Sequence, residues 1–64
     1  MEIYIEKIDK KMNIDFNGTC EGLLLRLNIN PDEVLVLKNN ICVPIEIKID
    51  NEDNIRILSV ISGG

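Results

Sequence analysis

The sequence predicts an α+β domain in which one short helix packs across one face of a mixed sheet of four to five strands. Three observations lead to this fold class. Isoleucine dominates the apolar residues and recurs in short alternating runs, which is typical of strands. A single stretch of the chain has the apolar spacing of a helix. The chain has 64 residues, 45% of them hydrophobic, so we expect residues 1–60 to form a single domain.

The first two strands are expected to form an antiparallel hairpin. Residues 1–8 are expected to form a half-buried strand, with Met1, Ile3 and Ile5 on one face and Glu2, Tyr4 and Glu6 on the other. Ile8 falls out of this register. Residues 9–11 (DKK) make a polar turn, and residues 12–16 alternate again. Residues 1–16 therefore read as strand, turn and strand.

A short helix follows the hairpin. Thr19 is a good N-cap residue, because its hydroxyl can accept a hydrogen bond from the first turn. The apolar stripe, spaced i, i+3, i+4 and i+7, consists of Cys20, Leu23, Leu24 and Leu27. Asn28 can adopt the left-handed conformation that ends a helix, and Pro31 prevents the helix from resuming.

Three further strands complete the order. Residues 34–37 (VLVL) are a continuous apolar run, so either the valines or the leucines can face the core. A tight turn at Asn39-Asn40 leads into a short strand at residues 41–43, which Pro44 confines to an edge. Residues 45–49 alternate and are interpreted as an extension of that edge, and the last strand covers residues 55–60.

The resulting order, β-β-α-β-β-β, is that of the β-grasp fold. The first and last strands should lie side by side as parallel neighbours in the middle of the sheet, because the long connection between them permits this pairing. The expected inward-facing residues are Ile3, Ile5, Ile14, Leu23, Leu24, Leu27, Ile55 and Ile57.

The charge balance points to protein partners. Lysine and arginine total 7 against 11 aspartate and glutamate, a net charge of −4, and the cations are scattered. Nucleic-acid binding requires clustered cations, so we expect no nucleic-acid binding, and a basic partner protein is the better complement.

No stretch approaches the roughly 20 apolar residues of a membrane span. The N-terminus lacks the pattern of a signal peptide, so the expected location is the cytoplasm.

Cysteine and histidine usage argues against a metal site and against an enzyme active site. The chain has two cysteines, Cys20 and Cys42, and no histidine, so no bound cofactor or metal is expected. Cys42 is assigned to the core. Cys20 either fills the core or, as a thiol at a helix N-terminus, relays sulfur or forms a thioester. The acidic residues between 50 and 53 are interpreted as a solvated turn.

The terminal Ser62, Gly63 and Gly64 suggest a chemical role for the end of the chain. Residues 61–64 are expected to form a flexible tail that reaches roughly 13 Å beyond the sheet. Glycine has no Cβ, so such a tail fits a narrow channel. The carboxylate of Gly64 becomes a good acyl donor once it has attacked the α-phosphate of ATP to give an acyl-adenylate. The alternative is an inert end.

Three segments carry a family resemblance. Residues 19–27 (TCEGLLLRL), 34–44 (VLVLKNNICVP) and above all 55–64 (IRILSVISGG) resemble the ThiS/MoaD family of ubiquitin-like sulfur carriers, and the short chain is most similar to the ThiS branch. Two features differ: Asn39-Asn40 replaces the common Asn-Gly turn, and the segment from Pro44 to Ile55 is compressed.

The resemblance implies a carrier that other enzymes act on. An ATP-dependent activating enzyme (adenylyltransferase) would adenylate Gly64, with Gly63 and Ser62 fitting its channel. A sulfur donor protein would then convert the carboxylate to a thiocarboxylate. The sulfur would pass to a downstream synthase of thiamine thiazole or molybdopterin, or to a tRNA thiolation enzyme.

Two alternatives to the sulfur carrier remain. Ubiquitin-like modifiers of archaeal type share the fold and the tail, and they would join Gly64 to target lysines. The third reading is a β-grasp interaction module whose tail is inert.

One face of the sheet is a candidate docking surface. If Ile55 and Ile57 point toward the helix, the neighbouring residues of the last strand point away from it. The candidate docking residues are Tyr4, Arg56, Leu58 and Val60. The resemblance implies docking on the activating enzyme through this face, whereas scattered surface hydrophobes or self-association are the alternatives.

Overall fold

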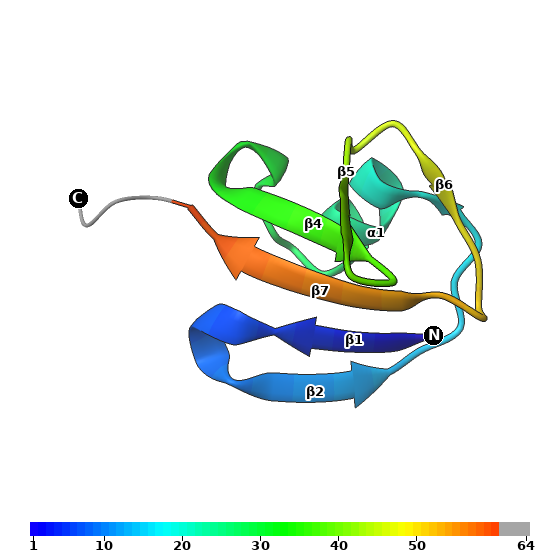
Figure 1. The fold of residues 1–64 in the computed structure, drawn as a ribbon, viewed down its shortest axis with the longest axis horizontal. Coiled ribbons are helices and arrows are strands. Elements are labelled where there is room, and N and C mark those ends of the chain that lie inside the picture. The colour runs from blue at the N-terminus through cyan, green and yellow to red at the C-terminus, as the bar shows by residue number, and fades with distance from the viewer. Residues whose placement is uncertain (61–64) are drawn as a thin grey trace.

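A five-stranded sheet with one helix across it forms the body of the molecule (Figure 1). The structure is a computed structural model that describes residues 1–60. The strand order is β2-β1-β7-β4-β5. The bounds of these elements are Glu2–Ile5 for β1, Lys10–Asn13 for β2, Cys20–Arg26 for α1, Val34–Lys38 for β4, Ile41–Val43 for β5 and Asn54–Ser59 for β7. Within residues 1–60 the expected mixed sheet, its one α-helix and the β-β-α-β-β-β order of the main sheet are confirmed.

The parallel pairing of the first and last strands is also confirmed. Ile3 lies opposite Ile55, and Ile5 lies opposite Ile57, along the ladder between β1 and β7. Residues opposite one another in a ladder project to the same face of the sheet. These four isoleucines therefore form one apolar surface, and each of them is at most 9% exposed.

The N-terminal hairpin is shorter than predicted. A 3₁₀ turn, Glu6–Ile8, follows β1, and Asp9 closes it in the left-handed conformation with φ 49°. The N–H of Asp9 donates to the carbonyl of Glu6 at 3.1 Å. Strand pairing in β2 ends at Asn13, although residues 12–16 were predicted as strand. Strand β1 ends at Ile5, so the turn is longer than predicted, and Ile8, which was expected to leave the register, lies 59% exposed in it.

Both ends of α1 are capped as predicted. The N–H of Gly22 donates to Oγ1 of Thr19 at 3.1 Å. At the other end Asn28 has φ 62° and its N–H bonds the carbonyl of Leu25 at 3.0 Å. The N–H of the next residue, Ile29, reaches the carbonyl of Leu24 at 2.8 Å, which completes a Schellman motif.

Residues 45–49 do not extend the edge of the main sheet, so that prediction was wrong. They cross the N-terminus of α1, where the carbonyls of Ile47 and Ile45 accept the N–H groups of Cys20 and Glu21, both at 2.9 Å. A second small sheet then pairs β6 (Lys48–Ile49) with β3 (Gly18–Thr19). The first N–H groups of a helix lack partners within the helix, and this segment supplies them.

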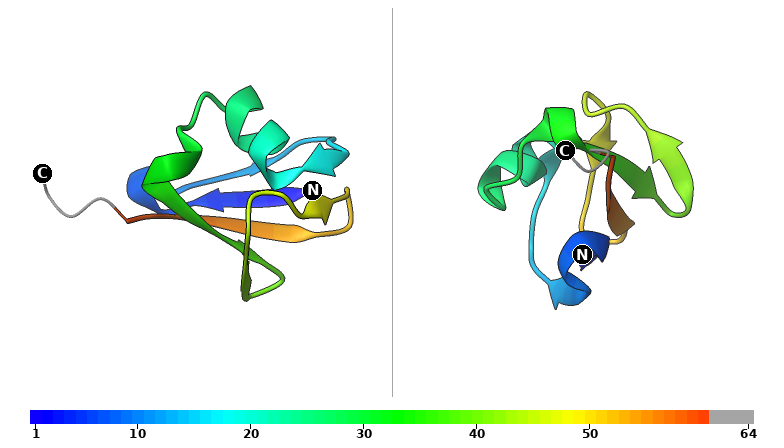
Figure 2. Two further views of the ribbon diagram at one scale, coloured as in Figure 1. Left: turned by 90° about the horizontal axis from the view of Figure 1, so that it is seen from above. Right: turned by 90° about the vertical axis from the view of Figure 1, so that its left-hand side faces the viewer.

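The core lies between the sheet and α1 (Figure 2). Its buried residues are Met1, Ile3, Ile5, Cys20, Leu23, Leu24, Val36, Ile49, Ile55 and Ile57. Ile14 and Leu27, which were also expected to face inward, are partly buried and pack against it. Val36 is 2% exposed, so the valines of β4 face the helix and its leucines face the other way.

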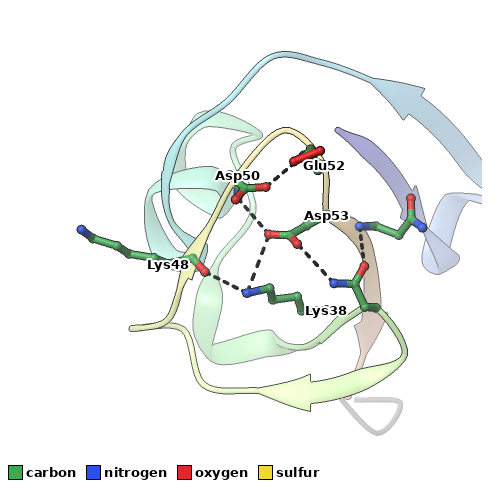
Figure 3. A network of polar contacts seen from close by, with 7 residues as sticks. Lys38, Lys48, Asp50, Glu52 and Asp53 are labelled. Atoms are coloured by element: carbon green, nitrogen blue, oxygen red, sulfur yellow. Dashed lines mark hydrogen bonds and ion pairs between the residues drawn. The ribbon is translucent and has the colours of Figure 1, made fainter.

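A polar network around Asp53 joins the acidic turn to β4 (Figure 3). The Asp53 carboxylate lies 3.7 Å from Nζ of Lys38 and accepts hydrogen bonds from the backbone of Asp50 at 2.9 Å and from the amide of Asn39 at 3.2 Å. Lys38 also donates to the carbonyl of Lys48 at 3.3 Å. The hydrogen bond from Asp50 is the main reason why the pKa of Asp53 lies below its ordinary value.

We predict that Asp53→Asn lowers the urea midpoint of unfolding at pH 7. A carboxyl whose pKa is lower in the folded state stabilises the fold above its ordinary pKa of about 4, and this contribution is lost as the pH falls through the lowered pKa. The difference between the variant and the wild type should therefore shrink in acid. Glu52→Gln, a change in the same turn, is the control. A difference that stays constant from pH 7 to pH 2 would contradict the network's role.

Candidate functional site: the outer face of the sheet

The sheet has one face that α1 leaves uncovered (Figure 2). Tyr4 of β1 lies opposite Arg56 of β7, and Arg56 in turn lies opposite Leu37 of β4. Two residues along the same ladder, and on the same face, Leu58 lies opposite Leu35. We call this surface the outer face and define it by Tyr4, Leu35, Leu37, Arg56 and Leu58.

The outer face has an apolar centre and a charged rim. Leu35 is 47% exposed, and Leu37 and Leu58 are half-buried. Glu2 and Lys11, an ion pair at 3.8 Å, lie at the β1–β2 side of this centre. An apolar centre within a polar rim is the usual arrangement of a protein interface.

Sequence reasoning placed Tyr4, Arg56 and Leu58 on this face but missed Leu35 and Leu37. A continuous apolar run has no alternation that assigns one set of side chains to the core. The ladder between β4 and β7 makes the assignment, because Val36 lies opposite the buried Ile57. The missing signal was the pairing register, which no local pattern encodes.

Arg56 and Tyr4 form a cation–π contact on the outer face. Cζ of Arg56 lies 5.5 Å from the centroid of the Tyr4 ring. The guanidinium is also 4.0 Å from the carboxylate of Glu6, but both side chains are about half exposed. An exposed ion pair at this distance contributes little to stability, so a partner can displace it.

Tyr4 is held at its hydroxyl end as well. Its O–H donates to Oδ1 of Asp9 at 2.7 Å. This hydrogen bond is the largest cause of a raised pKa of the Tyr4 phenol, because the neutral phenol is the form that donates. The ring is therefore fixed both at its face and at its tip.

A shallow hollow of about 470 Å³ adjoins Tyr4 and Arg56. It lies beside the turn between β4 and β5, and its lining residues are Glu2, Tyr4, Lys11, Asn39, Asn40, Asn54, Ile55 and Arg56. Asn39 and Asn40 have φ 52° and 71°, so both central residues are left-handed, as the predicted tight turn requires. The hollow offers space for a side chain of a partner.

Val60, the fourth predicted docking residue, directly follows β7 and is 45% exposed. Its N–H donates to the carbonyl of Glu33 at 3.1 Å. Residues 61–64, which were predicted to form a flexible tail and include Ser62, Gly63 and Gly64, lie outside the described residues. Their role in acyl transfer stays a prediction.

The two cysteines have opposite environments. Cys20 is fully buried, and burial raises the pKa of its thiol, which favours core packing over the alternative of a reactive thiol. Cys42 is exposed, so its assignment to the core was wrong. It lies opposite Leu37, on the outer side of β5. Within residues 1–60, no cluster of three His, Cys, Asp or Glu side chains could hold a metal ion.

Comparisons with known proteins complete the description. The family model described as small archaeal modifier protein 2 (SAMP2) matches residues 2–61. A relative from Archaeoglobus fulgidus, named only as an uncharacterized protein, is 36% identical over 56 residues, which cover 86% of this chain and 82% of the relative. No helix within residues 1–60 has the length and apolar character needed to cross a membrane.

We predict that a water-soluble maleimide labels one thiol in the native protein and two in denaturant. Cys42 is exposed and should react at neutral pH, whereas Cys20 is buried with a raised pKa and should react only on unfolding. Intact mass after brief labelling counts the adducts, and Cys42→Ser should abolish native labelling. Rapid native labelling of both thiols would show that Cys20 is accessible.

Proposed function

The chain belongs to the small archaeal modifier protein 2 family, a ubiquitin-like family related to ThiS and MoaD, and from this premise we propose that it is joined through Gly64 to lysine amines of target proteins. The observation that carries the proposal is the family match over residues 2–61, on a chain with β-grasp strand order. The match favours the modifier, which sequence analysis had placed second to the sulfur carrier.

The proposed chemistry begins with activation by a partner. An oxygen of the Gly64 carboxylate attacks the α-phosphorus of ATP, the bond to pyrophosphate breaks, and an acyl-adenylate forms. A lysine amine then attacks the carbonyl carbon, AMP leaves, and loss of a proton gives an amide. Gly63 and Gly64 have no Cβ, so no side chain of theirs would obstruct entry, with Ser62, into a narrow nucleotide site of the enzyme. The activating enzyme and ATP supply the reactivity.

Sulfur transfer is a second candidate, favoured by the resemblance of residues 55–64 to the ThiS/MoaD tail. Sulfur transfer starts from the same acyl-adenylate of Gly64 as conjugation does. A persulfide of a donor protein attacks the carbonyl, AMP leaves, and a second thiol reduces the acyl disulfide to a thiocarboxylate. The sulfur would then serve thiamine thiazole or molybdopterin synthesis, or tRNA thiolation.

The outer face is well placed to meet the activating enzyme. Strand β7 contributes Arg56 and Leu58 to this face, and Gly64 follows Val60 by four residues in the sequence. Four extended residues span roughly 13 Å. An enzyme that holds Gly64 must therefore approach the end of β7. We propose that its docking surface covers the leucines and Tyr4 of the outer face.

Mass spectrometry distinguishes conjugation from thiocarboxylate formation, because the two products carry different mass changes. Trypsin cleaves after Arg56, so a conjugated lysine should carry residues 57–64 as a branched remnant. The thiocarboxylate should appear on the intact protein as the replacement of one oxygen by sulfur. We predict the branched remnant in protein from the native cell, and its loss when Gly63 and Gly64 are deleted. If neither mass change appears and the deletion leaves growth and partner binding unchanged, the inert interaction module is the correct reading.

We predict that Leu35→Ser weakens activation and that Leu25→Ser does not. Leu35 is 47% exposed on the outer face, whereas Leu25 is 63% exposed on α1, so the two changes remove similar side chains from different surfaces. Loss of one apolar contact at the centre of an interface should raise the KM of the activating enzyme roughly fivefold to tenfold. ATP–pyrophosphate exchange measures KM. Equal effects of the two variants would contradict docking through the outer face.

A further inference from the structure

We propose that Asp9 is a positioning residue, which fixes the ring of Tyr4 on the outer face for the activating enzyme. The inference rests on the proposed function, because it concerns how that face is presented to its partner. Asp9 itself lies outside the strands, at the end of the turn between β1 and β2.

The geometry places Asp9 at the tip of the Tyr4 side chain. After β1 the chain passes through the 3₁₀ turn Glu6–Ile8, and Asp9 ends that turn with φ 49°. Its Oδ1 accepts the Tyr4 hydroxyl at 2.7 Å. A hydroxyl that donates to a carboxylate makes a short charge-assisted hydrogen bond, stronger than one between neutral groups.

Arg56 constrains the same ring from a second direction. The parallel ladder puts Arg56 opposite Tyr4, with Cζ 5.5 Å from the ring centroid. A side chain fixed at both its tip and its face has little rotational freedom left to lose. Ordering a mobile side chain costs free energy on association, so a ring that is already fixed binds more tightly. Tyrosine and arginine are also prominent among the residues that dominate interface energetics.

The side chain of Asp9 is not needed to make the turn. A left-handed φ is accessible to glycine without strain, and the backbone hydrogen bond from Asp9 to Glu6 does not involve the carboxylate. The hydrogen bond to Tyr4 is exposed and lies across the sheet from the core, so it contributes little to the stability of the fold. The hydrogen bond therefore acts mainly on the orientation of the Tyr4 ring on the outer face.

The test compares four proteins as substrates of the purified activating enzyme from the same cell, by ATP–pyrophosphate exchange. They are the wild type, Asp9→Gly, Asp9→Asn and Tyr4→Phe. Asp9→Gly and Tyr4→Phe each remove one partner of the hydrogen bond and should raise KM about threefold to tenfold with kcat unchanged. Asp9→Asn keeps an acceptor oxygen and tolerates the left-handed backbone, so its KM should stay near that of the wild type.

A second measurement reports the contact without any enzyme. Tyr4 is the single tyrosine of the chain, so its ionisation can be followed directly by ultraviolet absorbance. The pKa of the phenol should be raised in the wild type and should move toward its ordinary value in Asp9→Gly. Unchanged thermal unfolding of Asp9→Gly would confirm that the turn is intact.

Specific outcomes overturn the inference. If the phenol pKa of Asp9→Gly returns toward its ordinary value while KM stays equal to that of the wild type, the fixed ring does not assist docking. An Asp9→Asn protein as impaired as Asp9→Gly, beside a normal Tyr4→Phe, would show that the charge of Asp9 acts without Tyr4. A wild type that supports no pyrophosphate exchange would instead defeat the proposed function and the inference with it.

Discussion

The parallel ladder between β1 and β7 is the constraint on which the rest of the structure depends. It aligns Ile3 and Ile55 on one side of the sheet and Tyr4 and Arg56 on the other. A chain this short buries only about 60% of the surface that its unfolded form exposes, so it has room for one core. Because a ladder fixes both faces of a sheet together, the same pairing that closes the core also assembles the outer face.

Much of this fold was predictable, because its central strands and its helix carry strong local signals. Isoleucine recurs at every second position at Ile3 and Ile5 in β1 and at Ile55 and Ile57 in β7, so these residues could be assigned to the core. Thr19 and Asn28 marked the ends of α1 through their capping chemistry, and Asn39-Asn40 marked a turn that needs two left-handed residues. In each case the sequence preference and the final structure agree.

The errors arose where tertiary contacts decide the conformation. The run in β4 lacks alternation, so only its pairing with β7 turns Leu35 outward, and the pairing of β5 with β4 then exposes Cys42. Residues 45–49 alternate as a strand does, but the carbonyls of Ile45 and Ile47 accept hydrogen bonds from the first N–H groups of α1. The sequence therefore predicted only part of the outer face. The hydrogen bond from Tyr4 to Asp9 was not predicted, because it depends on the conformation of the turn between β1 and β2.

The central claim is that an activating enzyme contacts the outer face while it acts on Gly64. Methyl-labelled leucine gives the most direct measurement, because every leucine of the chain lies on the outer face, in α1 or, for Leu27, at the C-cap of α1. On titration with the enzyme and ATP, the methyl resonances of Leu35, Leu37 and Leu58 should shift or broaden, and those of the exposed Leu25 should not. Changes confined to Leu25 and its helix, with the outer-face leucines unaffected, would contradict the account.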